Sequence, residues 1–124
     1  MDRLTNWAIA AWRRTPLSRR PRFSRTVACS SRGGVPDSLN QRELYLIGQP
    51  AKWAILACPC GTGHTIDLNL ANPQTTQWQV EGAAVPTLHP SIDVRDPTGR
   101  CHFWLRGGRV HWVQPPRTRP NPNA

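Results

Sequence analysis

Residues 58–64 read CPCGTGH, and residues 101 and 102, about forty positions later, read CH. These two short stretches hold three of the four cysteines and two of the four histidines of the chain. Zinc in proteins prefers four thiolate or imidazole ligands in a tetrahedron. A turn that contains Gly61 and Gly63 can aim two thiolates at one point, because glycine adopts backbone conformations that other residues avoid. Two distant turns that converge on one ion therefore predict a Zn²⁺ site.

The expected ligands of this ion are Cys58, Cys60, Cys101 and His102, with His64 competing for the fourth position. Neighbours on a regular strand point to opposite faces, so Cys101 and His102 can share an ion only if their strand begins irregularly. The alternatives are a histidine hydrogen-bonded to backbone and cysteines that are plain buried thiols. A closed set of four ligands would be structural, whereas three ligands and a water would be catalytic.

A chain of this size is expected to need a metal site or another cross-link for stability. With 124 residues the chain has room for one domain, and small cores are commonly supplemented by a metal, disulfides or a partner. Residues 1–22 contain no secretory signal, and no apolar run approaches the roughly 20 residues of a membrane span. We therefore expect a reduced, cytoplasmic protein without a membrane segment, in which a metal site is favoured over a disulfide framework or free thiols.

The net charge of +9 is concentrated at the N-terminus. Residues 1–32 hold eight arginines against Asp2, which accounts for +7 of the +9. Residues 1–34 are predicted to be a basic arm, with a short amphipathic helix over residues 3–14 followed by disorder. Residues 1–32 could bind nucleic acid through its phosphates, dock on a partner, or remain a solvated tail.

Residues 35–113 are predicted to form short strands. The expected strands are residues 44–47, 53–58, 64–70, 78–80 and 85–94, followed by a hairpin over residues 101–113. The fold class is mainly β: a small single domain of short antiparallel strands and hairpins, stapled by a metal site and preceded by the basic arm. Residues 114–124, which are rich in proline, are predicted to be a disordered tail.

The hairpin over residues 101–113 has the clearest signal, because Gly107 and Gly108 suit a two-residue turn with positive φ. In that register Leu105 faces Val110. The same register places Phe103 opposite Trp112 and Trp104 opposite His111. Cys101, Phe103 and Leu105 then share a core face, and His102 lies on the other face.

The ordered motifs CPCGxGH, the alternating strand ending in Leu-Asn-Leu, TLHPSI at residues 87–92 and HFWLRGGRVHW at residues 102–112 resemble a known family. Its members are small bacterial and phage proteins, some encoded beside bacterial ubiquitin-like conjugation genes and regarded there as metal-dependent peptidases. The resemblance spans residues 42–113. It implies metal binding by Cys58 and Cys60 and a site role for His102. The family often has a cysteine at the positions of Thr62 and Gly99, and a serine at the position of Cys101.

The resemblance implies a zinc-dependent peptidase that processes or removes a ubiquitin-like modifier. His64 and Ser91 are the candidate catalytic residues, although Ser91 can also be read as a turn serine. Asp67, Asp93 and Asp96 are the acids near the motifs, with Asp67 expected on a solvated strand face and the other two in a loop. The alternatives are a non-enzymatic, zinc-stapled binding module that holds nucleic acid or a ribonucleoprotein with its arginine-rich arm, and an adaptor with a vestigial site.

Overall fold

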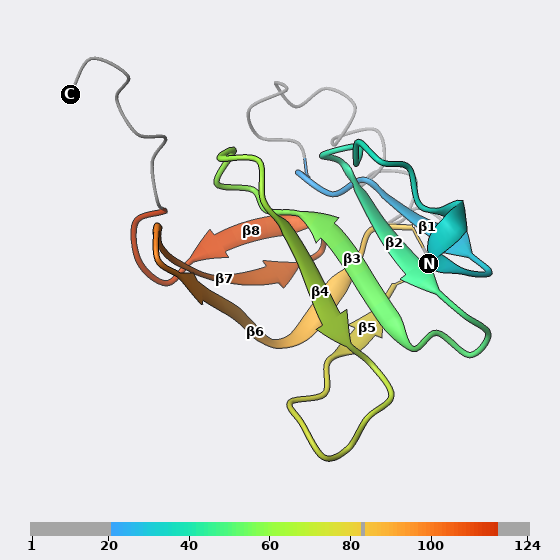
Figure 1. Ribbon diagram of the computed structural model, residues 1–124. Helices are drawn as coiled ribbons and strands as arrows, with labels where there is room; N and C mark the ends of the chain where they lie inside the picture. Colours follow the sequence, from blue (N-terminus) through green and yellow to red (C-terminus); the bar gives the residue numbers. More distant parts are fainter. Residues whose placement is uncertain (1–20, 83, 117–124) are drawn as a thin grey trace, which may run out of the picture.

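The computed structural model describes residues 21–82 and 84–116, and within them the fold is mainly β (Figure 1). The strands of the described residues are β1 Arg25–Cys29, β2 Glu43–Ile47, β3 Trp53–Ala57, β4 Thr65–Asn69, β5 Gln79–Glu81, β6 Thr87–Asp96, β7 Gly99–Arg106 and β8 Arg109–Trp112. A short 3-10 helix, Arg32–Gly34, follows β1. The predicted fold class is therefore confirmed.

Two four-stranded sheets make up the domain. The first has the order β1-β2-β3-β4, with β1 parallel to β2 and the other pairs antiparallel. The second, β5-β6-β7-β8, is antiparallel throughout. The main core contains side chains from both sheets, so the sheets pack against each other around it. Its fully buried members include Leu44, Leu56, Leu88, Ile92 and Phe103.

The first sheet is also covered on its outer face. Tyr45, Ile47 and Ile55 form a second buried cluster there with Cys29. Because β2 and β3 are covered on both faces, the LYLI that follows Glu43 in β2 and the WAILA of β3 are continuously apolar instead of alternating. By contrast, β4 alternates between exposed and buried residues, which is the pattern of a strand with one covered face.

The hairpin of β7 and β8 has the predicted register. Leu105 pairs with Val110, Phe103 with Trp112, and Trp104 with His111. Gly107 and Gly108 form the turn with φ values of 56° and 73°. The β3–β4 hairpin is likewise present and carries residues 58–64 at its turn.

The predicted N-terminal arm differs from the structure over its second half. Phe23 is fully buried in the main core, and its N–H donates to the carbonyl of Gly108 at 2.9 Å. Arg25–Cys29 forms β1, which pairs with β2. The many arginines of residues 1–32 favoured the prediction of an arm and obscured the short strand within it. A parallel pair also has no hairpin turn that would mark it in the sequence. The helix predicted over residues 3–14 and residues 117–124 of the predicted tail lie outside the described residues.

No helix in the described part of the chain is long and apolar enough to cross a membrane.

Candidate functional site

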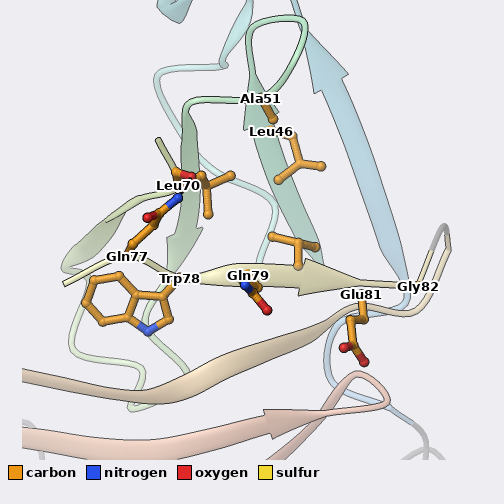
Figure 2. Close-up of a pocket in the computed structure, with 9 residues that line it drawn as sticks. Leu46, Ala51, Leu70, Gln77, Trp78, Gln79, Glu81 and Gly82 are labelled. Carbon is orange, nitrogen blue, oxygen red and sulfur yellow. Dashed lines mark hydrogen bonds between the residues drawn. The ribbon is translucent and has the colours of Figure 1, made fainter. Parts of the chain in front are cut away.

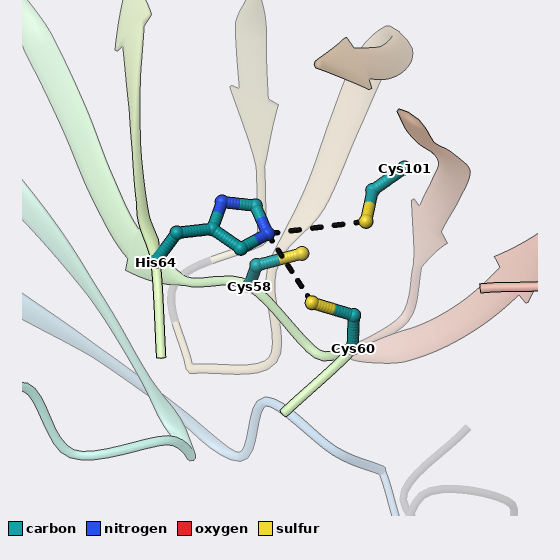
Figure 3. Close-up of side chains that lie close together, drawn as sticks. All are labelled: Cys58, Cys60, His64 and Cys101. Atoms are coloured by element: carbon teal, nitrogen blue, oxygen red, sulfur yellow. Dashed lines mark hydrogen bonds between the residues drawn. The ribbon is translucent and has the colours of Figure 1, made fainter. Parts of the chain in front are cut away.

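The first candidate site lies where the β3–β4 turn meets the start of β7. Cys58, Cys60, His64 and Cys101 each offer one ligand atom, and these atoms all lie within 4.8 Å of one another. The Nε2 atom of His64 is 3.2 Å from the Sγ atom of Cys60 and 3.8 Å from that of Cys101. Figure 3 shows the four side chains pointing toward one another. We call this group the Cys3His cluster.

The turn that carries three of these residues is held by its own backbone. The N–H of Cys58 donates to the carbonyl of His64 at 3.0 Å, which closes the turn. Gly61 and Gly63 have φ values of 78° and 94°, in the region where a Cβ atom is disfavoured. The side chain of Thr62 lies 3.1 Å from the sulfur of Cys60. The predicted aiming of two thiols by a glycine turn is thus present in the fold.

The donor set suits a zinc ion. Three sulfurs and one imidazole nitrogen form a common Zn²⁺ ligand set, and sulfurs around a tetrahedral zinc lie roughly 3.8 Å apart. Separations of at most 4.8 Å require only a small contraction. Cys58 and Cys101 are buried, so an ion bound by the cluster would be held largely away from water. The cluster can hold a metal ion.

The two cysteines of the turn differ in acidity. Burial raises the pKa of the Cys58 thiol well above its ordinary value. Burial also acts to raise the pKa of Cys60, but hydrogen bonds from Thr62 and from the neighbouring thiols outweigh it, so the pKa of Cys60 is lowered. Cys60 is therefore the thiol of this pair that ionises first, and a bound cation would be needed to ionise Cys58.

His102, the fourth ligand expected from the sequence, lies outside the cluster. Cys101 points into the core, and its neighbour on the regular strand β7 points to the opposite face of the sheet. The strand is already regular at Cys101, which pairs with Val94, so the irregular start that would have let both residues reach one ion is absent. His64, the competing candidate, occupies the fourth corner.

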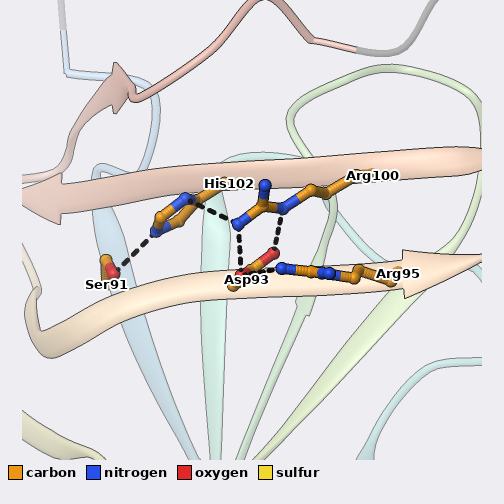
Figure 4. A network of polar contacts seen from close by, with 5 residues as sticks. All are labelled: Ser91, Asp93, Arg95, Arg100 and His102. Atoms are coloured by element: carbon orange, nitrogen blue, oxygen red, sulfur yellow. Dashed lines mark hydrogen bonds and ion pairs between the residues drawn. The ribbon is translucent and has the colours of Figure 1, made fainter.

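A second candidate site lies on the outer face of the second sheet. The Oγ atom of Ser91 on β6 is 2.9 Å from the Nε2 atom of His102 on β7. The same face carries Asp93, Arg95 and Arg100 (Figure 4). We call these five residues the Ser-His row. Ser91 and His102 are half-buried, and the hydroxyl of Ser91 has the imidazole of His102 beside it.

A β-bulge brings Ser91 into this position. Leu88 pairs with Leu105, whereas Ile92 pairs with Phe103, so three residues of β6 stand opposite Trp104 alone. The register between β6 and β7 thus shifts by two residues. Because side chains alternate between faces with a period of two, Leu88 and Ile92 both remain in the core. Bulges commonly re-aim side chains next to active sites. Pro90 lies inside the bulge, where its missing N–H interrupts no ladder bond.

Asp93 and Arg100 form the charged part of the row. Two hydrogen bonds of 2.8 Å join the guanidinium of Arg100 to the carboxylate of Asp93, and Arg95 adds a contact of 3.5 Å. The hydrogen bonds from Arg100 hold the pKa of Asp93 well below its usual range, and the same pair raises the pKa of Arg100. Asp93 is directly opposite His102 in the ladder. Asp93 and Asp96 both lie on β6 and not in the loop where they were expected.

Arg100 separates this carboxylate from the imidazole. Its Nη2 atom is 3.5 Å from the Nδ1 atom of His102, a long contact in which only the guanidinium can donate. Sequence reasoning assigned His102 to the metal and gave Asp93 no partner. Strand alternation had already placed His102 on the face opposite Cys101 and left His64 as the competing ligand, and the regular pairing of β7 agrees with that alternative.

The remaining acid near the motifs has a surface role. Asp67 lies on the exposed face of β4, as expected, where it pairs with Arg32 at 3.1 Å.

A family model described as "Bacterial ubiquitination-like system serine protease (BubE)" matches residues 31–113, well over half of the chain. This chain belongs to the BubE family. The resemblance to proteins encoded beside bacterial ubiquitin-like conjugation genes is thereby confirmed. The family description names a serine protease, and the BubE match includes both the Cys3His cluster and the Ser-His row. Neither the curated proteins nor the solved structures contain a match to this chain.

Proposed function

We propose that this protein is a serine peptidase that processes a ubiquitin-like modifier or removes it from conjugates. In this proposal Ser91 is the nucleophile and His102 is its general base. The observation that carries it is the 2.9 Å contact between Ser91 Oγ and His102 Nε2 at the surface of the second sheet. A nucleophile within hydrogen-bond reach of a base is the geometric signature of covalent catalysis by a hydroxyl.

The reaction follows the general chemistry of acyl transfer. His102 Nε2 takes the proton of the Ser91 hydroxyl while Oγ forms a bond to the substrate carbonyl carbon. The scissile C–N bond then breaks, and the imidazolium gives its proton to the departing amine. Water, deprotonated by the same imidazole, then forms a bond to the acyl carbon, and the imidazolium returns the proton to Ser91 Oγ as the bond between Oγ and the acyl group breaks. In each half of the reaction, Nε2 holds the transferred proton until the leaving group takes it.

Asp93 is the residue suited to orient the imidazole. A base that accepts on Nε2 carries its own proton on Nδ1, and a carboxylate is the usual acceptor for that proton. Asp93 stands opposite His102 and is kept ionised by Arg100. In the present arrangement Arg100 lies between them and faces Nδ1 with an N–H, which suits the tautomer that carries its proton on Nε2. General-base catalysis by Nε2 therefore requires Arg100 to move aside, so that Nδ1 carries the proton and donates it to Asp93.

We assign Zn²⁺ to the Cys3His cluster as a structural ion outside the reaction. Four protein ligands fill a tetrahedral coordination sphere and leave no open position for water. When bound, the ion would supply a cross-link between the β3–β4 turn of the first sheet and β7 of the second. Cys101 would thereby fix the start of the strand on which His102 is the next residue. The proposal therefore differs from the metal-dependent peptidase expected from the resemblance: the ion stabilises the fold, and Ser91 carries the reaction.

The proposal is tested with four variants and two assays. Ser91→Ala and His102→Gln are expected to lower hydrolysis of modifier precursors or conjugates at least about a thousandfold. Their controls, Ser38→Ala and His111→Gln, change an exposed serine and an exposed histidine that are not among the five residues of the row, and they should leave the rate unchanged. His111 lies on the neighbouring strand β8, opposite Trp104, so it also tests whether loss of any imidazole on this face is enough to lower the rate. A fluorophosphonate probe should add its mass to Ser91 in the wild type.

Retention of activity in Ser91→Ala would overturn the serine mechanism. If activity instead disappeared on chelation while the fold persisted, the ion would be catalytic. The predicted contact of residues 1–32 with nucleic acid stays a prediction, since residues 1–20 lie outside the described residues.

A further inference from the structure

A groove of about 510 Å³ runs between the first sheet and the edge strand β5 (Figure 2). Leu46 and Leu70 line it from the first sheet, and Trp78, Gln79, Val80 and Glu81 line it from β5 and the residue before it. The groove contains neither the Cys3His cluster nor the Ser-His row.

The floor of this groove is apolar and firmly held. Leu46, Leu70, Trp78 and Val80 are partly buried and pack against the main core. Their outer surfaces therefore remain accessible while their inner surfaces are fixed by fully buried neighbours. A preformed apolar surface costs little conformational entropy when a ligand binds to it.

One wall of the groove is the edge of a sheet. β5 has a strand neighbour on one side only, namely β6. An edge strand presents backbone N–H and C=O groups that can pair with an added chain, and several peptide-binding domains capture extended segments in this way. Backbone pairing along β5 and apolar contacts on the floor together suit a peptide in the β conformation.

The groove connects to the proposed nucleophile. The indole N–H of Trp78 donates to the backbone carbonyl of Ser91 at 3.4 Å. Gln79 pairs with His89, which precedes Ser91 on β6 by two residues. Two residues of extended chain span roughly 7 Å. A segment paired to the free side of β5 would lie two strand spacings, roughly 10 Å, from β6, and its continuation past the end of β5 could reach the hydroxyl on the outer face.

We propose that this groove binds an extended, partly apolar and non-acidic segment of the substrate next to the scissile bond. The inference rests on the proposed peptidase function and adds to it the site that holds the substrate chain. Glu81 is the one charged residue of the lining, and it disfavours an acidic segment. Alternate apolar side chains of the bound segment would face the leucines and Trp78, since a β strand directs every second side chain to one face.

The test measures binding apart from cleavage. A randomised nonapeptide library is selected on the Ser91→Ala protein, which keeps the groove and lacks the nucleophile. Enriched peptides should be poor in Asp and Glu and apolar at alternate positions. Val80→Asp in the same background should lower their affinity at least tenfold. Ser38→Asp places the same charge on an exposed serine that lines neither the groove nor the Ser-His row and should have no effect.

Gln79→Asp is the second groove variant, because Gln79 is exposed and its substitution leaves the core untouched. Equal affinity in all three aspartate variants, or no enrichment at all, would overturn the groove assignment. If Val80→Asp, with Ser91 present, cleaved the substrate with the KM of the wild type, the groove assignment would be overturned. The peptidase proposal would then stand. Groove-dependent binding without cleavage would contradict the peptidase proposal and retain the binding site.

Discussion

At the scale of single residues, His64 and His102 have separate tasks although both stood beside cysteine motifs in the sequence. His64 belongs to the Cys3His cluster and His102 contacts Ser91. We therefore expect His64→Ala to lower zinc content, measured by mass spectrometry of the native protein, and His102→Gln to retain about one ion per chain. Loss of zinc in His102→Gln with retention in His64→Ala would reverse the two assignments.

Asp93 gives a prediction that depends on pH. Its pKa is lowered chiefly by Arg100, so the ionised carboxylate stabilises the folded state above the unfolded pKa of about 3.9. That stability is lost as the pH falls through the lower folded pKa. The carboxyl ¹³C signal of Asp93 should stay constant from pH 7 to about pH 4.5 in the wild type, while Arg100→Gln should make it begin to move in this range. An unaltered signal in the variant would show that Arg100 does not set the acidity of Asp93.

At the scale of the elements, the β7–β8 turn also binds two other segments of the chain through backbone hydrogen bonds. Gly108 accepts a hydrogen bond from the N–H of Phe23 at 2.9 Å and donates one to the carbonyl of Pro86 at 2.8 Å. A Cβ atom added at Gly108 would come into steric conflict with the carbonyl oxygen of Phe23, whereas one added at Gly107 would meet nothing within 4 Å. The turn thus anchors two other segments of the chain through one glycine.

Gly107→Ala and Gly108→Ala form a matched pair. Both residues have positive φ, so each alanine is expected to cost about 1–2 kcal/mol from backbone strain. Gly108→Ala should cost more than about 2 kcal/mol in total, because the backbone of Phe23 must also move. The free energy of unfolding in urea measures the difference. Equal values for the two variants would contradict the close contact.

At the scale of the whole molecule, the ion would join the two sheets. Its proposed ligands come from the β3–β4 turn and from β7, which belong to different sheets. Removal of zinc by a chelator should therefore lower the melting temperature by well over 10 °C or unfold the domain, because metal binding contributes folding free energy. Near-ultraviolet circular dichroism and thermal unfolding check this. An unchanged melting temperature after complete removal of zinc would contradict a structural role.

The sequence predicted local features better than distant ones. The Gly107-Gly108 turn and the alternation beside it defined the last hairpin in its observed register. The cysteine turn was placed at the end of a hairpin, as observed. β1 was missed because its partner is a distant parallel strand. Asp93 was assigned to a loop although it fell at the end of the strand predicted over residues 85–94; a bulge accommodates Pro90, and β6 continues to Asp96.

One consequence follows from the adjacency of Cys101 and His102 on a regular strand. A slip of β7 by a single residue would exchange the two side chains between the faces of the sheet. The slipped chain would lose a zinc ligand and the base of Ser91 together. Under the assignments made above, the zinc bound per chain therefore sets an upper limit on the concentration of working active sites. Metal analysis of a preparation would therefore bound the number of working active sites even before any substrate is known.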